Sequence, residues 1–260
     1  MSLRYVSARG GAIVVGASSG IGAEVARELS RRGYYVALVA RREAQLRALA
    51  QAITIHQDLD NIRVYPHDVR DYASAPALFA RIADEFQSAG APLNLLVYSA
   101  GVMPLPGSDG PWTFADERAM IEINLLAAIQ WSDLAAAYFT QRKSGVIIGI
   151  SSVAGDRGRK GNSVYMASKA GLSTYLESLR YRLANVGVRV VTIKPGIVAT
   201  PMTAEAGTPR FITAKPEAVA RRIADAATGG GSVIYTPWFW RPIMGLIQSL
   251  PPFIMKRLSI

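Results

Sequence analysis

The chain has 260 residues, of which 50% are hydrophobic and 18% are charged, a composition typical of a globular protein. It contains no cysteine, which excludes disulfides, thiolate catalysis and cysteine metal sites, and its two histidines are too few to favour a metal centre. The net charge of +10 comes from scattered basic residues, so an anionic cofactor or an anionic membrane surface explains it at least as well as nucleic acid, for which no aromatic-plus-basic motif is present.

Strand-like and helical patterns alternate along the whole chain. Short apolar runs rich in β-branched residues predict strands at 12–15, 35–40, 62–65, 93–98, 146–150, 188–193 and 233–235. Apolar residues at helical spacing predict helices at 23–32, after Arg42 to 52, 75–88, 116–141, from near Tyr165 to 186, and 216–227. This alternation predicts an α/β fold, a doubly wound parallel sheet of about seven strands with helices on both faces.

No linker of changed composition interrupts the pattern, so we expect one domain over 1–236 and an apolar tail over 237–260. The first residues lack the long apolar run of a signal peptide, and no apolar run approaches the roughly 20 residues that cross a bilayer. We therefore expect a cytoplasmic protein, with membrane association through the tail left open.

Chemically suggestive residues follow one predicted strand after another. In open parallel sheets, ligands bind outside the carboxyl ends of the strands, where the strand order reverses. The residues in question are Gly16, Arg41, Asp68, Gly101, Ser152 and Pro195. Their common location predicts a single ligand site at this edge of the sheet.

The first of these segments is a glycine-rich loop over 16–22, between the first strand and the first helix. Glycines at the spacing G-x-x-x-G-x-G let backbone N–H groups approach a pyrophosphate, and the helix N-terminus favours the anion. The spacing differs from G-x-G-x-x-G, and a purely structural turn is the alternative.

Arg41 follows the second strand, where NAD-binding proteins usually place an acidic residue for the ribose 2′-hydroxyl. An arginine there suits a 2′-phosphate through charge-assisted bonds, and Ser18 could add a hydroxyl. The sequence therefore favours NADP(H) over NAD(H). The alternative is a solvated charge at the start of a helix.

Tyr165 and Lys169 lie four residues apart, on one face of a predicted helix. An ammonium favours the phenolate and so lowers the tyrosine pKa from about 10, which would make Tyr165 a general acid/base. Ser152, after the fifth strand, could polarise a substrate carbonyl. Taken alone, such a pair also occurs by chance on an ordinary helix face.

Together, these motifs fall in the order found in a known family. They are Gly16-x-x-x-Gly20-Ile21-Gly22, Asp68-Val69, Asn124, Ile150-Ser151-Ser152, Tyr165-x-x-x-Lys169 and Pro195-Gly196-Ile197-Val198-Ala199-Thr200. Over residues 12–202 the chain thus resembles the short-chain dehydrogenase/reductase family. The resemblance implies a Rossmann fold, hydride transfer between a nicotinamide and a carbonyl or alcohol, and a homo-dimer or homo-tetramer.

The resemblance also implies roles for single residues. Tyr165 would exchange the proton, Lys169 would lower its pKa and hold the nicotinamide ribose, and Ser152 would orient the substrate oxygen. Asn124 would hold a water in a relay to Lys169. The implied cofactor contacts are Gly16, Ser18, Ser19, Gly20, Ile21, Gly22, Arg41, Arg42, Asp68, Val69, Ser99, Ala100, Gly101, Tyr165, Lys169, Pro195, Gly196, Val198 and Thr200. Ser152 and Tyr165 would bind substrate, and no metal is expected.

The chain departs from the family at Val15, often threonine, and at Tyr98-Ser99-Ala100-Gly101, where the family has Asn-Asn-Ala-Gly. It also lacks the glycine-rich final strand of the family's acyl-carrier-protein reductases. Its place is taken by the tail, whose aromatic and basic residues suit a membrane interface. The alternatives are that the tail covers the substrate cleft or a subunit interface.

The tail favours a lipophilic substrate, because the neighbours of the cleft are apolar, and residues 201–215 are either a substrate lid or an ordinary surface loop. The leading hypothesis is an NADP(H)-dependent carbonyl reductase or alcohol dehydrogenase. A cofactor-binding sensor or scaffold without turnover is the alternative.

Overall fold

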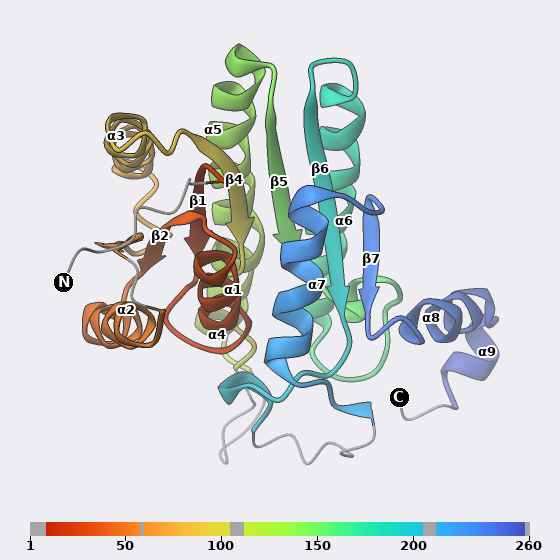
Figure 1. Cartoon of the computed structure of the whole chain (residues 1–260). Coiled ribbons are helices and arrows are strands. Elements are labelled where there is room, and N and C mark those ends of the chain that lie inside the picture. Colours follow the sequence, from red (N-terminus) through yellow and green to blue (C-terminus); the bar gives the residue numbers. More distant parts are fainter. Residues whose placement is uncertain (1–8, 58–59, 105–111, 205–211, 258–260) are drawn as a thin grey trace.

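The computed structural model describes residues 9–57, 60–104, 112–204 and 212–257 (Figure 1). Within them, one sheet of parallel strands has the order β3-β2-β1-β4-β5-β6-β7. The strands are β1 (Gly11–Val15), β2 (Tyr35–Ala40), β3 (Ile62–Pro66), β4 (Leu93–Tyr98), β5 (Gly145–Ile150), β6 (Val188–Pro195) and β7 (Val233–Thr236). The seven-stranded parallel sheet confirms the predicted fold class.

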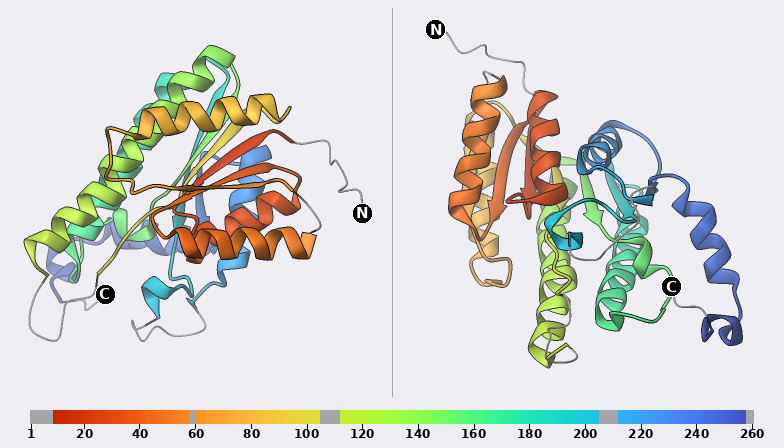
Figure 2. Two further views of the ribbon diagram at one scale, coloured as in Figure 1. Left: turned by 90° about the vertical axis from the view of Figure 1, so that its left-hand side faces the viewer. Right: turned by 90° about the horizontal axis from the view of Figure 1, so that it is seen from below.

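Helices cover both faces of this sheet (Figures 1 and 2). One core layer includes α1 (Gly20–Arg31), α2 (Glu43–Gln57) and α7 (Pro216–Thr228), and the other includes α3 (Ala75–Ser88), α5 (Ala127–Arg142) and α6 (Ser163–Leu183). The strands are apolar on both faces, as buried parallel strands must be. In β1, for example, Ala12 and Val14 face the first layer while Ile13 and Val15 face the second.

The strand order reverses beside β1, which pairs with β2 on one side and with β4 on the other. The chain first builds outward from β1 to β3 and then crosses to β4. Such a reversal leaves a crevice outside the carboxyl ends of β1 and β4, because the two connections leave in opposite directions.

The single helix predicted over 116–141 is wrong in one respect. The structure has α4 (Phe114–Ile121), a π-helical turn (η1, Glu122–Leu126) and then α5. Carbonyls of the turn accept hydrogen bonds from outside the helix: Tyr98 donates its hydroxyl to the Ile123 carbonyl at 2.6 Å. Periodicity could not reveal this widened turn, because it depends on a side chain from a distant strand.

The tail forms α8 (Trp240–Ser249) and α9 (Pro252–Met255), separated at the two prolines. Helix α8 is fixed to the domain, since Met244 is fully buried and the Trp240 indole packs against Gly196 so closely that a Cβ there would overlap with it. Among the described residues, no helix is long and apolar enough to cross a membrane.

Leu176 joins α6 to the sheet, because its side chain is fully buried and occupies the space where a Cβ on Gly149 of β5 would lie. We expect Leu176→Ala to lower the free energy of unfolding by about 2–5 kcal/mol, measured by urea denaturation, because it leaves a cavity at this contact. Tyr181→Ala, at an exposed position of the same helix, serves as the control and should cost less than about 1 kcal/mol. Equal losses would show that this contact does not hold α6 in place.

Candidate active site

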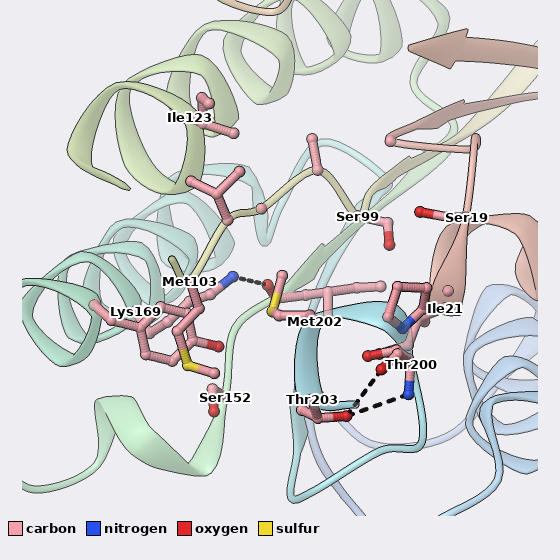
Figure 3. Close-up of a pocket in the computed structure, with 18 of the residues that line it drawn as sticks. Ser19, Ile21, Ser99, Met103, Ile123, Ser152, Lys169, Thr200, Met202 and Thr203 are labelled. Carbon is pink, nitrogen blue, oxygen red and sulfur yellow. Dashed lines mark hydrogen bonds between the residues drawn. The ribbon is translucent and has the colours of Figure 1, made fainter. Parts of the chain in front are cut away.

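A cavity of about 800 Å³ opens at the carboxyl ends of the central strands. Figure 3 shows Ser19, Ile21, Ser99 and Thr200 at one end, and Ser152, Lys169 and Met103 at the other. All of the predicted cofactor and catalytic residues line this cavity except Gly22, Asp68 and Asn124. The structure therefore brings together segments that follow six strands, β1 to β6, as the sequence pattern predicts.

The glycine-rich loop closes the cavity below β1. Gly16 has a positive φ of +87°, and a Cβ there would overlap with the backbone of Ala100 after β4. A Cβ on Gly22 would likewise overlap with the Gly16 carbonyl. The loop thus packs against the neighbouring strand end, and α1 begins at Gly20 with its N-terminus at the cavity, an arrangement that binds anions.

Two arginines, Arg41 and Arg42, follow β2, and their side chains have different partners. Arg42 donates to the Ser18 hydroxyl and to the Ser19 hydroxyl, both at 2.8 Å from its Nη2. Arg41 lies 3.8 Å from the Asp68 carboxylate. The bonds to Ser18 and Ser19 hold the Arg42 guanidinium beside the glycine-rich loop. Arg42 is therefore at least as well placed as Arg41 to bind an anion at this loop.

Asp68 and Val69, two of the implied cofactor contacts, lie in different surroundings. Val69 lines the cavity, whereas the Asp68 carboxylate accepts two bonds from the Arg70 guanidinium, at 3.2 and 2.7 Å. Hydrogen bonding to Arg70 lowers the pKa of Asp68, so its carboxylate is held as an anion outside the cavity lining. The Asp68 carboxylate therefore holds the Arg70 guanidinium by hydrogen bonds and attracts the Arg41 guanidinium 3.8 Å away.

Ser152, Tyr165 and Lys169 meet at the other end of the cavity. Helix α6 starts at Ser163 because Asn162 caps it, accepting a hydrogen bond from the Tyr165 N–H at 2.8 Å. One turn later, the Lys169 ammonium donates to the Ile150 carbonyl at 3.0 Å and lies 5.8 Å from the centre of the Tyr165 ring. Ser152 and Tyr165 both line this end of the cavity, and the Ser152 hydroxyl accepts from the Ala154 N–H at 3.0 Å.

The lowering of the Tyr165 pKa by Lys169 stays a prediction, and burial acts against it in this arrangement. Burial raises the pKa of Tyr165, and its hydrogen bond with Ser152 opposes that rise. Burial also lowers the pKa of Lys169 to about 8, because its ammonium is removed from water. Burial alone therefore disfavours the charged form of both side chains. Additional positive charge near Tyr165 is needed to lower its pKa.

Asn124 sits fully buried in the π-helical turn. Its amide exchanges two bonds with the backbone of Val102, accepting from the N–H at 2.8 Å and donating to the carbonyl at 3.0 Å. A Cβ on Gly101 would lie 3.3 Å from Asn124 Oδ1 and 3.5 Å from Lys169 Nζ, so these three positions converge. Single π-helical turns frequently occur at functional sites. The turn therefore places the Asn124 side chain near the Lys169 ammonium, with Gly101 next to both.

Sequence reasoning missed several residues of the cavity wall. They include His67, Arg70, Met103, Pro104, Asp116, Ala119, Ile123, Val153, Ala154 and Arg159. Arg159 could have been noticed, since it lies between Ser152 and Tyr165, but no spacing rule singles it out. The lid prediction stays a prediction: 205–211 lie outside the described residues, and the lid residues Pro201, Met202 and Thr203 line the cavity.

Comparison with known proteins fits this geometry. The family model of short chain dehydrogenases matches residues 11–210, most of the chain and all the strands but the last. The chain therefore belongs to the short-chain dehydrogenase family, and it is an NAD(P)-dependent oxidoreductase.

Its relatives extend over nearly the whole chain. An uncharacterised oxidoreductase of Mycobacterium tuberculosis is 32% identical over 250 residues, covering 95% of this chain and 96% of the relative. An uncharacterised oxidoreductase of Myxococcus xanthus is 36% identical over 231 residues, 87% of each protein. Among solved structures, an actinorhodin polyketide ketoreductase with NADPH matches with a TM-score of 0.75 at 25% identity, covering 87% of this chain and 95% of that one.

Proposed function

We propose that this protein is an NADP(H)-dependent carbonyl reductase or alcohol dehydrogenase that acts on a lipophilic ketone, aldehyde or alcohol. One observation carries the proposal: a single cavity has the Ser152–Tyr165–Lys169 cluster at one end and a glycine-rich loop with Arg42 at the other. The close backbone approach at Gly16 and Gly22 leaves a cradle for a pyrophosphate, so the residues present fit a dinucleotide.

Each catalytic residue then has a defined task in the cavity. The nicotinamide supplies or accepts the hydride at carbon. Tyr165 gives its phenolic proton to the substrate oxygen in reduction and takes it back in oxidation. Ser152 hydrogen-bonds to the same oxygen, and Lys169 binds the ribose hydroxyls and stabilises the phenolate. Asn124, behind Lys169, holds the water that resupplies the proton.

The apolar part of the cavity wall supports a lipophilic substrate. Met103, Ile123, Val153 and Met202 line the same cavity as Ser152 and Tyr165. Methionine side chains adapt to varied apolar shapes, which suits a long or irregular hydrocarbon group.

The alternative is a sensor or scaffold that binds NADP(H) without turnover. Such a protein does not need the catalytic side chains, whereas Ser152, Tyr165 and Lys169 all line the cavity. Removing the phenolic hydroxyl separates the two hypotheses.

We expect Tyr165→Phe to bind NADPH as tightly as the unaltered protein but to lose nearly all turnover, about 100-fold or more, because the proton donor is gone. The assay is NADPH oxidation against a panel of medium-chain ketones and aldehydes, with NADPH affinity followed by fluorescence. Tyr175→Phe, which removes a hydroxyl from the same helix outside the cavity, is the matched control. Turnover that survives Tyr165→Phe would refute the mechanism. No NADPH oxidation on any substrate would favour the sensor hypothesis.

We infer that the arginines after β2 select NADP(H) over NAD(H) by binding the 2′-phosphate. Arg42 and Ser18 already lie within hydrogen-bond distance of one another, and a phosphate between them would accept from both. The NADPH in the actinorhodin ketoreductase structure agrees with this choice.

Arg42→Ala and Arg41→Ala should each weaken NADPH binding by about 10–100-fold and NADH binding much less, because only NADPH offers a charged phosphate. Titration of both cofactors by fluorescence measures the ratio. Arg47→Ala, which removes an exposed arginine from α2, should change neither affinity. Equal losses for the two cofactors would rule out the phosphate role.

The tail supports a second proposal, contact with a membrane surface from a cytoplasmic protein. Trp238, Leu246 and Phe253 are 75%, 66% and 65% exposed, although Met244 of α8 is buried. Arg241 and Lys256 flank this apolar surface, a pattern that suits anionic lipid. Family members generally form oligomers, so a subunit interface is the competing occupant.

Replacing Trp238, Leu246 and Phe253 together by serine should weaken binding to anionic phospholipid vesicles by at least about tenfold, because each large apolar side chain contributes roughly 1.5–3 kcal/mol when buried. Co-sedimentation measures this binding. A Phe114→Ser variant, altered at an exposed aromatic residue elsewhere, should sediment like the unaltered protein. If sedimentation is unchanged but the mass of the triple variant falls to that of a monomer, the surface is a subunit interface.

A further inference from the structure

Arg159 differs from every other cation on the cavity wall. Arg42 bonds to Ser18 and Ser19, Arg70 bonds to Asp68, and Arg41 lies near the same carboxylate. Lys169, the remaining cation, donates to a backbone carbonyl. Among the described residues, no acceptor lies within hydrogen-bond or ion-pair distance of the Arg159 guanidinium, although this side chain lines the cavity.

The surroundings of Arg159 make this lack of a partner costly. The side chain is half-buried, and burial lowers its pKa, although an arginine stays charged at any physiological pH. A partly desolvated cation with no carboxylate in ion-pair contact is unfavourable even though the charge of Asp156 attracts it, and an anion that enters the cavity would reduce that penalty.

Asp156 is the acidic residue nearest in sequence, and it is already engaged. One carboxylate oxygen accepts from the Lys194 ammonium and the other from the Tyr235 hydroxyl at 2.9 Å. Its side chain is fully buried beneath these donors, with its charge matched by Lys194. A structural ion pair therefore does not explain Arg159.

The segment that carries Arg159 is fixed from a distant part of the chain. The Arg157 guanidinium donates to the carbonyls of Gln248 and Leu250, at 2.8 and 3.0 Å, at the end of α8. The Gln248 side chain donates in return to the Asp156 carbonyl at 3.1 Å. These bonds hold residues 156–159 on the β6–β7 side of the sheet, between η2 (Val153–Gly155) and α6.

This location separates Arg159 from the cofactor's phosphates. Arg42 follows β2, and three strands, β1, β4 and β5, lie between β2 and β6. The pyrophosphate cradle lies at β1, with β4 and β5 between it and β6. Arg159 therefore belongs to the substrate end of the cavity, beside Ser152 and Tyr165.

We propose that Arg159 binds an anionic group of the substrate, a carboxylate or a phosphate, through bidentate charge-assisted hydrogen bonds. The proposal rests on the proposed function, because it assumes that the space beside Tyr165 receives a substrate. It defines the substrate as an amphiphile: the anion is held by Arg159, and its hydrocarbon part lies against Met103 and Met202.

The test measures binding to the enzyme saturated with NADP⁺, so it does not depend on turnover. Decanoate and decyl phosphate are compared with 1-decanol by isothermal titration calorimetry. The unaltered enzyme should bind at least one anion about 10–100-fold more tightly than the alcohol. The carboxylate and phosphate arms show which anion is preferred.

Arg159→Ala should abolish this preference and leave 1-decanol binding unchanged, and Arg159→Lys should retain part of it. Lys160→Ala, which removes the same charge from the exposed neighbour, is the matched control and should keep the preference. Thermal melting and NADPH affinity check that each variant is folded. Arg159→Gln replaces the alanine variant if the latter does not fold.

Two results would overturn the proposal. One is that the unaltered enzyme binds neither anion more tightly than 1-decanol. The other is that Arg159→Ala weakens all three ligands equally. Tyr165→Phe separates this inference from the proposed function, because it should lose turnover and keep the anion preference. Retained turnover in that variant would refute the mechanism while the binding result for Arg159 still held.

Discussion

The structure depends on backbone segments that approach one another more closely than side chains allow. Gly16 and Gly22 let the loop after β1 press against the end of β4. On the other side of the cavity, Gly155 lies against the backbone of α6, where a Cβ would be 2.6 Å from the Lys169 carbonyl carbon. The first approach forms the cradle for an anion, and the second holds η2, and with it Ser152, beside Tyr165. The two halves of the site are thus fixed by the same kind of packing.

The fold was predictable because each buried strand is a short apolar run and each is followed by a helix-spaced pattern. The site was predictable as far as it consists of residues that directly follow strands, since parallel strands end at one edge. Positions set by tertiary contacts were not predictable. The π-helical turn depends on the Tyr98 hydroxyl, and the role of Arg42 depends on Ser18 and Ser19 in another loop. Arg159 is placed by bonds from α8, about ninety residues later.

The electrostatics of the cavity add a factor that the Tyr165–Lys169 spacing alone does not reveal. The helical repeat puts the two side chains on one face, but burial acts on both groups and disfavours either charge. The ammonium also faces the Ile150 carbonyl. Proton transfer at Tyr165 thus depends on what occupies the cavity, because bound hydroxyls and an anionic cofactor change the field that both groups experience.

Helix α8 connects the apolar surface of the tail to the chemistry of the cavity. Its Trp240 packs on Gly196, which lines the cavity, and its last turn holds the segment that carries Arg159. The same helix exposes Leu246 to its surroundings. A substrate with an anionic head and a hydrocarbon chain would meet both features, since Arg159 suits the head while the tail suits an interface where such chains reside. The two proposals thus share one physical basis: an amphiphilic substrate requires charge inside the cavity and apolar surface beside it.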